Sequence, residues 1–223
     1  MDPVFVRLRS SRQEGLTPDL ELSAGLYLPC GAAEPATSRS VPGLVVGHGA
    51  GSRAANHDDF CVEACRQGFA VLALDFRGHG RSKGKADGPL ELDILAAVEF
   101  LRAHPAVDPR LVCYRGSSLG GFYGLKAGPL AGFIAMVLLC PAGEDVILDA
   151  LDDLEGMEVD GDTEAPDGRP TAGGSSAATA RWDRPRLRAY FQEQDSRELA
   201  ARVDCPVLLV HARPDRQVPF EHS

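Results

Sequence analysis

The chain has 223 residues, of which 44% are hydrophobic and 25% are charged, and it carries a formal net charge of −9. This length suits one domain, or one domain with an insertion, and allows a large buried core. The acidic balance argues against a nucleic-acid partner or an anionic membrane surface, and no apolar run reaches the roughly 18 residues needed to span a bilayer. The N-terminus lacks the basic and apolar regions of a signal peptide, so we expect a cytoplasmic protein.

Alternation of apolar and polar residues predicts two antiparallel strands at the start of the chain, over Val4–Arg9 and Leu20–Leu28. From Gly43 onward, short apolar runs alternate with helical patterns. These runs predict strands over Gly43–Val46, Phe69–Asp75, Leu111–Arg115, Phe133–Leu139 and Pro206–His211. The helical patterns cover residues 55–67 and 89–103 and the segment that begins at Leu119. Strands buried on both faces and separated by helices are typical of an α/β fold with a mostly parallel, doubly covered sheet.

An acidic segment interrupts this pattern between Glu144 and Pro185. Its first half has no Lys or Arg before Arg169, and residues 171–180 are only Gly, Ser, Ala and Thr. Such a composition buries too little apolar surface to fold alone, so we predict that residues 156–180 are mobile. We therefore expect a core formed by residues 1–143 and 186–223, with residues 144–185 as a partly disordered insertion. This insertion is interpreted either as a lid or as a plain solvated loop.

Six cysteines are spread along the chain, and several lie in apolar runs, as buried reduced thiols do. They are Cys30, Cys61, Cys65, Cys113, Cys140 and Cys205. His57, Cys61 and Cys65 are four residues apart, so they could share one helix face. A zinc site usually needs a fourth ligand and a loop-based knuckle, and neither is visible in the sequence. Packing on a helix face explains the spacing, and we predict neither a metal nor another cofactor.

The strongest motif is Gly-Ser-Ser-Leu-Gly-Gly at residues 116–121, which follows an apolar strand and opens a helix. This is the context of a G-x-S-x-G nucleophile elbow, in which a strained turn presents the Ser118 hydroxyl. Gly116 and Gly120 have no Cβ and permit such a turn. The N–H of Leu119 then lies at a helix N-terminus, where it can stabilise an oxyanion. An unreactive Ser- and Gly-rich loop is the alternative interpretation.

A second glycine-rich motif, at residues 47–52, also follows an apolar strand. Together with Asp75 at the end of the next strand, it imitates a dinucleotide-binding unit and suggests an oxidoreductase. However, Ser52 occupies the position of the third glycine in that fingerprint. The oxidoreductase interpretation also explains neither the turn at residues 76–82 nor the elbow at Ser118.

Taken together, the motifs at residues 48–51, 75–82 and 116–121 resemble those of alpha/beta-hydrolases of the serine aminopeptidase (S33) and dienelactone-hydrolase-like group. The segment Leu208–Pro219 resembles the strand and turn that carry the catalytic acid in this family. The resemblance extends from about Gly43 to Pro219, and it is specific for the fold rather than for a substrate.

The resemblance implies that Ser118 is the nucleophile, that Asp215 orients a catalytic histidine, and that the N–H groups of Leu119 and Ala50 form the oxyanion hole. It further implies supporting roles in the surrounding turns for His48, Gly49, Gly51, Gly116, Gly120 and His79. The same resemblance places the catalytic histidine one helix and one strand beyond the acid.

Only His222 follows Asp215 in this sequence, which ends at Ser223. His222 comes after Pro219, in what we predict to be the first turn of a helix, and has no reason to point back toward Ser118. We therefore expect that the catalytic histidine and the last strand are missing through C-terminal truncation. A serine without its base is a poor nucleophile, so this chain is expected to be inactive.

The sequence predicts a serine hydrolase that cleaves a carboxylic ester, thioester or amide through an acyl-enzyme on Ser118. The expected partner is a small-molecule or short peptide-like substrate. A non-catalytic binding module with the same fold is the first alternative, and a dinucleotide-binding oxidoreductase is the second.

Overall fold

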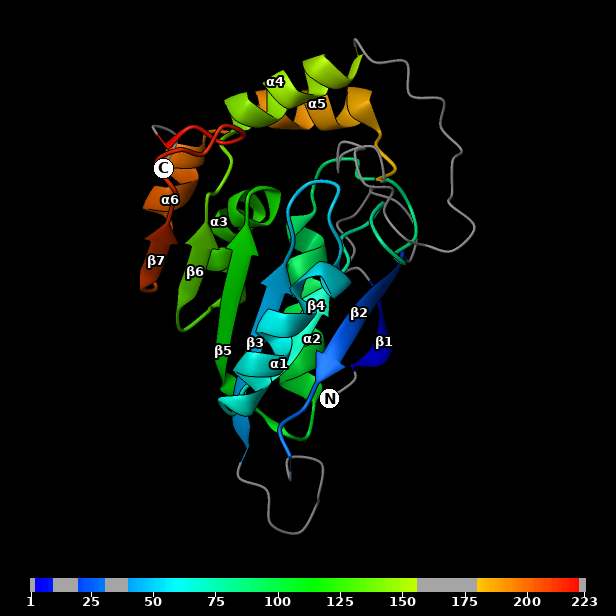
Figure 1. Cartoon of the computed structure of the whole chain (residues 1–223), viewed down its shortest axis with the longest axis vertical. Helices are drawn as coiled ribbons and strands as arrows, with labels where there is room; N and C mark the ends of the chain where they lie inside the picture. Colours follow the sequence, from blue (N-terminus) through cyan, green and yellow to red (C-terminus); the bar gives the residue numbers. More distant parts are fainter. Residues whose placement is uncertain (1–2, 10–19, 31–39, 156–179, 221–223) are drawn as a thin grey trace.

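The computed structural model describes residues 3–9, 20–30, 40–155 and 180–220. Its centre is a seven-stranded sheet with the strand order β1-β2-β4-β3-β5-β6-β7 (Figure 1). Antiparallel pairing joins β1 (Val4–Arg9) to β2 (Glu21–Tyr27) and β2 to β4 (Ala70–Leu74). The remaining pairs are parallel and involve β3 (Val41–Gly47), β5 (Val107–Ser117), β6 (Met136–Leu139) and β7 (Val207–Val210). The predicted fold class, a mostly parallel sheet with antiparallel N-terminal strands, is confirmed.

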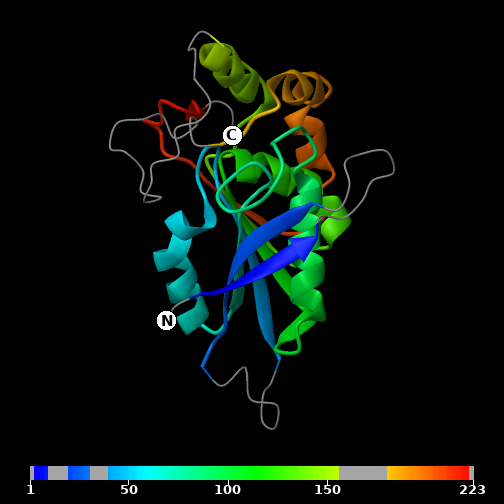
Figure 2. The same cartoon turned by 90° about the vertical axis from the view of Figure 1, so that its right-hand side faces the viewer.

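Helices cover both faces of this sheet (Figure 2). The helix α1 (Asp58–Arg66), preceded by the short 3-10 helix η1 (Ala54–His57), packs on one face against β4. On the other face α3 (Leu119–Ala131) contacts both α2 (Glu91–Ala103) and α6 (Ser196–Ala201). No helix within the described ranges has both the length and the apolar character needed to cross a bilayer.

The cysteines of α1 are part of the hydrophobic core. Cys61 and Cys65 are buried together with Tyr27 and Val71 between α1 and the sheet. The two thiols therefore pack on a helix face, as their spacing predicts.

Two helices lie side by side over the carboxyl ends of the parallel strands (Figure 1): α4 (Glu144–Glu155) and α5 (Arg184–Gln192). The sequence analysis predicted no helix here, because the acidic residues dominate the composition. The structure shows that α4 is amphipathic, since Ile147 and Leu151 are buried while Asp149 and Asp152 on the same helix are exposed. Except for Ala180, the predicted mobile segment at residues 156–180 lies outside the described residues.

The pairing of strands shifts two of the predicted boundaries. β5 begins at Val107 rather than Leu111, because Val107 pairs with Val41 across a register shift in β3. β6 begins at Met136 rather than Phe133, and the buried Phe133 ring stacks instead on Tyr114. In both cases contacts with a neighbouring segment, rather than local residue pattern, decide where the strand starts.

Candidate active site

Ser118 occupies a strained turn between the end of β5 and the first residue of α3. Its φ is +50° and its ψ is −117°, a conformation that residues with a Cβ rarely adopt. The Ser118 N–H donates to the carbonyl of Leu139 in β6 (2.9 Å), and the Ser118 carbonyl accepts from the N–H groups of Gly121 and Phe122. The turn is thus fixed by β6 on one side and by the first turn of α3 on the other, and it leaves the Ser118 side chain partly exposed.

The two glycines of the motif make room for this turn. A Cβ on Gly116 would overlap the carbonyl oxygen of Gly120. A Cβ on Gly120 would lie 2.7 Å from the carbonyl oxygens of both Gly47 and His48. The Gly120 N–H donates to the His48 carbonyl (3.1 Å), and the Tyr114 hydroxyl donates to the Gly120 carbonyl (2.6 Å). These close approaches bring the loop after β3 against the start of α3.

The loop after β3 passes directly beside the Ser118 hydroxyl. A Cβ built on Gly49 would lie 3.3 Å from Ser118 Cβ and 3.9 Å from Ser118 Oγ. Ala50 follows Gly49, and Gly51 continues the turn with a φ of +66°. Leu119 is the first residue of α3, where a backbone N–H has no acceptor within the helix. Both of the predicted oxyanion-hole amides therefore belong to segments that adjoin the hydroxyl.

Two buried histidines hold the loops around this turn. His48 donates from Nδ1 to the Gly49 carbonyl (2.7 Å) and accepts at Nε2 from the Phe76 N–H (3.1 Å). His79 donates from Nδ1 to the Arg77 carbonyl (3.1 Å). Burial lowers the pKa of His48 to about 4 and that of His79 to about 3, so both rings are neutral at pH 7. These contacts agree with the supporting roles that the family resemblance implies.

The carboxylate of Asp75 faces inward. Its Oδ1 accepts from the Ala54 N–H (2.6 Å) and its Oδ2 from the Arg81 N–H (3.0 Å), and the residue is buried. A dinucleotide site needs this acidic group to be open toward a ribose hydroxyl. The arrangement therefore disfavours the dinucleotide-binding alternative.

Asp215 lies in the loop after β7, at the same edge of the sheet as Ser118. The strand order places β6 between β5 and β7, and all three are parallel, so their carboxyl ends share one edge. Asp215 Oδ1 accepts from the N–H groups of Gln217 (2.9 Å) and Val218 (3.0 Å). These two backbone donors lower the pKa of Asp215, so the carboxylate is ionised. Its second oxygen, Oδ2, is not used by these amides.

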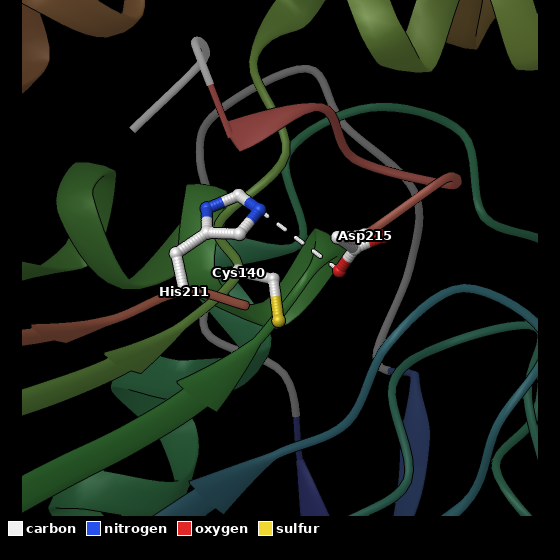
Figure 3. A group of neighbouring side chains, drawn as sticks. All are labelled: Cys140, His211 and Asp215. Atoms are coloured by element: carbon white, nitrogen blue, oxygen red, sulfur yellow. Dashed lines mark ion pairs between the residues drawn. The ribbon is translucent and has the colours of Figure 1, made fainter. Parts of the chain in front are cut away.

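The structure also brings His211 and Cys140 against Asp215 (Figure 3), and the sequence analysis missed both residues as site residues. His211 ends the apolar run of β7, and its Nε2 lies 3.9 Å from Asp215 Oδ2. Cys140 directly follows β6, and its sulfur lies within 4.8 Å of the donor atoms of His211 and Asp215. The signal that could have found them is their position, since each follows an apolar parallel strand at the edge of the sheet where sites form.

Each histidine in the described part of the chain has a recorded hydrogen-bond partner other than the Ser118 hydroxyl. His57 contacts the Arg115 guanidinium, and His211 donates from Nε2 to the Val218 carbonyl (2.8 Å). The partners of the remaining rings are Gly49 and Phe76 for His48, Arg77 for His79 and Ala106 for His104. His222, which the sequence analysis treated as an unlikely base, lies outside the described residues.

A family model places the chain among known proteins. The model of the alpha/beta hydrolase family matches residues 44–222, from β3 to beyond Asp215. The chain belongs to the alpha/beta hydrolase family. Its matched region contains the glycine-rich loop, the elbow at Ser118 and the acid loop described above, and its fold is that of the family.

Similar proteins include enzymes of different named activities. The chain is 34% identical over 96 residues to the polyketide transferase ATR5 of Stachybotrys chlorohalonatus. This alignment covers 41% of this chain and 32% of that protein. It is 26% identical over 228 aligned residues to the bifunctional esterase/perhydrolase DCH of Acinetobacter calcoaceticus. This second alignment covers 83% of this chain and 78% of that protein. This chain therefore spans only about a third of the length of ATR5.

Among solved structures, Est1E from Butyrivibrio proteoclasticus with bound ferulic acid has a TM-score of 0.66 at 22% sequence identity. The match covers 91% of this chain and 79% of that one. This likeness concerns the fold. The finer resemblance to serine aminopeptidases is not singled out by these matches and stays a prediction.

Proposed function

We propose that this chain supplies the nucleophile, the oxyanion hole and the acid of a serine hydrolase. The observation that carries the proposal is the backbone of Ser118, which is held at a φ of +50° at the N-terminus of α3. Strain of this kind persists in proteins mainly where it serves a function. Helix capping does not account for it, because the Ser118 side chain accepts no capping hydrogen bond from α3.

In the proposed reaction, Ser118 Oγ attacks the carbonyl carbon of an ester, thioester or amide while a histidine takes the hydroxyl proton. The new C–O bond turns the carbonyl oxygen into an oxyanion, which accepts hydrogen bonds from the N–H groups of Leu119 and Ala50. When the intermediate collapses, the leaving alkoxide, thiolate or amine takes the proton from the histidine. Water then repeats the attack on the acyl-enzyme, which releases the acid and restores the Ser118 hydroxyl.

The role proposed for Asp215 follows from its hydrogen bonds. Its Oδ1 is occupied by the amides of Gln217 and Val218, so Oδ2 is the oxygen that would accept from the catalytic histidine. The ionised carboxylate would hold that ring in the right tautomer and stabilise its charged form. The histidine itself is part of the proposal through the family resemblance, which places it after Asp215 in the chain.

A fluorophosphonate probe tests the nucleophile. We expect the probe to label the complete gene product at Ser118, and the Ser118→Ala variant to lose this label. Ser117→Ala is the matched control, because it removes a neighbouring hydroxyl from the end of β5 and should keep the label. Equal labelling of the Ser118→Ala variant would reject the assignment. A complete, folded protein that is not labelled would support the non-catalytic binding module instead.

The substrate class is tested with a panel of short and long p-nitrophenyl esters and an aminoacyl amide. We expect ester cleavage, because DCH, which covers 83% of this chain, is named as an esterase. Preferential cleavage of the amide would instead support the resemblance to serine aminopeptidases.

A further inference from the structure

Three potential metal ligands meet beside the proposed acid, and two of them have no part in the proposed hydrolysis. The thiol of Cys140, one imidazole nitrogen of His211 and one carboxylate oxygen of Asp215 all lie within 4.8 Å of one another. Figure 3 shows the His211 ring and the Asp215 carboxylate facing each other, with the Cys140 sulfur next to both. The residues come from the carboxyl ends of the adjacent strands β6 and β7.

The chemistry of these ligands selects a particular class of ion. Thiolate, imidazole and carboxylate together form a zinc-type donor set, whereas Mg²⁺ and Ca²⁺ prefer oxygen ligands alone. Three protein ligands would leave the fourth position of a tetrahedral ion for water. We propose that Cys140, His211 and Asp215 form a binding site for a zinc-type divalent cation.

The backbone already holds two of the ligands in place. The amides of Gln217 and Val218 bind Asp215 Oδ1 and thereby direct Oδ2 toward His211 Nε2, 3.9 Å away. Cys140 has a φ of +42°, which is unusual for a residue with a Cβ, and its N–H donates to the Val210 carbonyl (2.8 Å). This strained conformation between β6 and β7 sets the thiol beside the carboxylate.

The site is also compact, and its three residues are half-buried. Ligand atoms around a tetrahedral zinc ion are about 3.5 Å apart, as follows from metal–ligand bonds of about 2.0–2.3 Å. From separations of up to 4.8 Å, the three donors must therefore close by at most about 1.3 Å, a change that side-chain rotation can supply. The His211 side chain is only 2% exposed and that of Asp215 is 19% exposed, so the imidazole is the least solvated of the donors and the carboxylate is open to an entering ion.

Metal binding would replace a hydrogen bond and balance the charge. The Cys140 thiol would lose its proton to solvent as its sulfur becomes a ligand. The His211 Nε2–H now donates to the Val218 carbonyl, and the ring would carry its proton on Nδ1 instead, which leaves Nε2 free to coordinate. One thiolate and one carboxylate then neutralise the two positive charges of the ion.

Occupation of this site would regulate the hydrolase, a consequence that rests on the proposed function. Asp215 Oδ2 is the oxygen proposed to accept from the catalytic histidine, and it is also the oxygen nearest to His211. A bound cation and the catalytic histidine therefore compete for one atom. The expected result is inhibition by Zn²⁺.

The binding test uses Co²⁺ and Zn²⁺ on the purified protein, without any substrate. We expect one Co²⁺ per chain with a thiolate-to-cobalt absorption band, and competition by Zn²⁺. Loss of a residue that merely supports a metal ligand weakens metal binding by roughly 10–100-fold. Cys140→Ser and His211→Gln each change a proposed ligand itself, so each should weaken Co²⁺ binding by at least that factor. Cys205→Ser is the matched control, because Cys205 is another partly exposed free cysteine, located before β7. Equal Co²⁺ affinity and an unchanged absorption band in the Cys140→Ser variant would overturn the proposal.

A second measurement avoids the variants altogether. Zn²⁺ should slow the alkylation of Cys140 in the wild-type protein, read by mass spectrometry, and should leave the alkylation of Cys205 unchanged. Equal rates at Cys140 with and without Zn²⁺ would contradict the site.

For the regulatory consequence, Zn²⁺ should inhibit ester cleavage by the complete gene product, and the Cys140→Ser variant should need at least tenfold more Zn²⁺ for the same inhibition. Equal sensitivity of the two proteins would refute this consequence alone, and absence of esterase activity would count against the proposed function while the binding result stands.

Discussion

Replacing Ser118 by glycine and by alanine should separate backbone strain from the loss of the hydroxyl. Both variants remove Oγ, and neither loses a helix cap, because the Ser118 side chain caps no amide of α3. Alanine keeps the Cβ and so keeps the strain at a φ of +50°, which is of order 1–3 kcal/mol for a residue with a Cβ. Glycine relieves the strain but costs about 0.5–1 kcal/mol in unfolded-chain entropy. The net expectation from these two ranges is that Ser118→Gly is more stable than Ser118→Ala by about 0–2.5 kcal/mol.

The adjacent Ser117 supplies the control for this comparison. Ser117 is the last residue of β5 and does not have a positive φ, so Ser117→Gly should be less stable than Ser117→Ala by about 0.5–1 kcal/mol. Urea unfolding followed by circular dichroism gives the four free energies, provided that the slopes with denaturant agree. If Ser118→Gly is less stable than Ser118→Ala by as much as glycine is at position 117, the turn is not strained, and the main observation behind the proposed nucleophile is lost.

Three further outcomes are expected from the geometry. Gly120→Ala should abolish labelling by the fluorophosphonate probe and lower the free energy of unfolding, because the new Cβ would lie 2.7 Å from the carbonyl oxygens of Gly47 and His48. Normal labelling of this variant would show that the close approach is unimportant. Acidification from pH 7.5 to pH 5.0 should lower the free energy of unfolding by about 2 kcal/mol for each of His48 and His79. Their pKa values in the folded protein, about 4 and about 3, lie below the ordinary value of about 6.5. Over this pH range protons therefore bind these histidines in the unfolded chain but not in the folded one. His79→Asn should remove about 2 kcal/mol of the measured dependence in urea titrations, and an unchanged dependence would contradict the assignment. Leu208→Lys should reduce concentration-dependent self-association measured by light scattering, because Leu208 is 60% exposed on β7, which pairs only with β6 among the described residues. Undiminished self-association would show that the chains associate through another surface.

Local pattern was sufficient for most of the sheet and for the elbow. Strands such as β4 (Ala70–Leu74) are buried on both faces, so each one appears in the sequence as an uninterrupted apolar run. The elbow is equally local, since Gly116, Ser118 and Gly120 lie within five positions between a strand and a helix. The family match over residues 44–222 agrees with this part of the prediction.

The helices α4 and α5, and the grouping of Cys140, His211 and Asp215, were not visible in this way. The many acidic residues of α4 gave no indication that Ile147 and Leu151 form a buried face of a helix. Their burial depends on packing over the sheet rather than on the composition of the segment. Cys140 and Asp215 are separated by more than seventy positions and meet only because β6 and β7 pair in parallel. A cysteine at the end of an apolar run is ordinarily a packed core residue, so the neighbours of Cys140 in the chain do not distinguish it from one, and its place at the carboxyl end of a parallel strand is the one local signal.

The sequence by itself determined the order of the parallel strands along the chain and the turn that carries Ser118, because both depend on neighbouring residues and on backbone sterics. The candidate acid, Asp215, came from the family resemblance and stays a prediction. Only the tertiary structure decided which side chains stand around Asp215 and what covers the carboxyl ends of the strands. Those contacts arise from the spatial order β5-β6-β7 and from the packing of α4 against α5. Such long-range pairings are set by the burial of whole surfaces, which no short stretch of residues specifies.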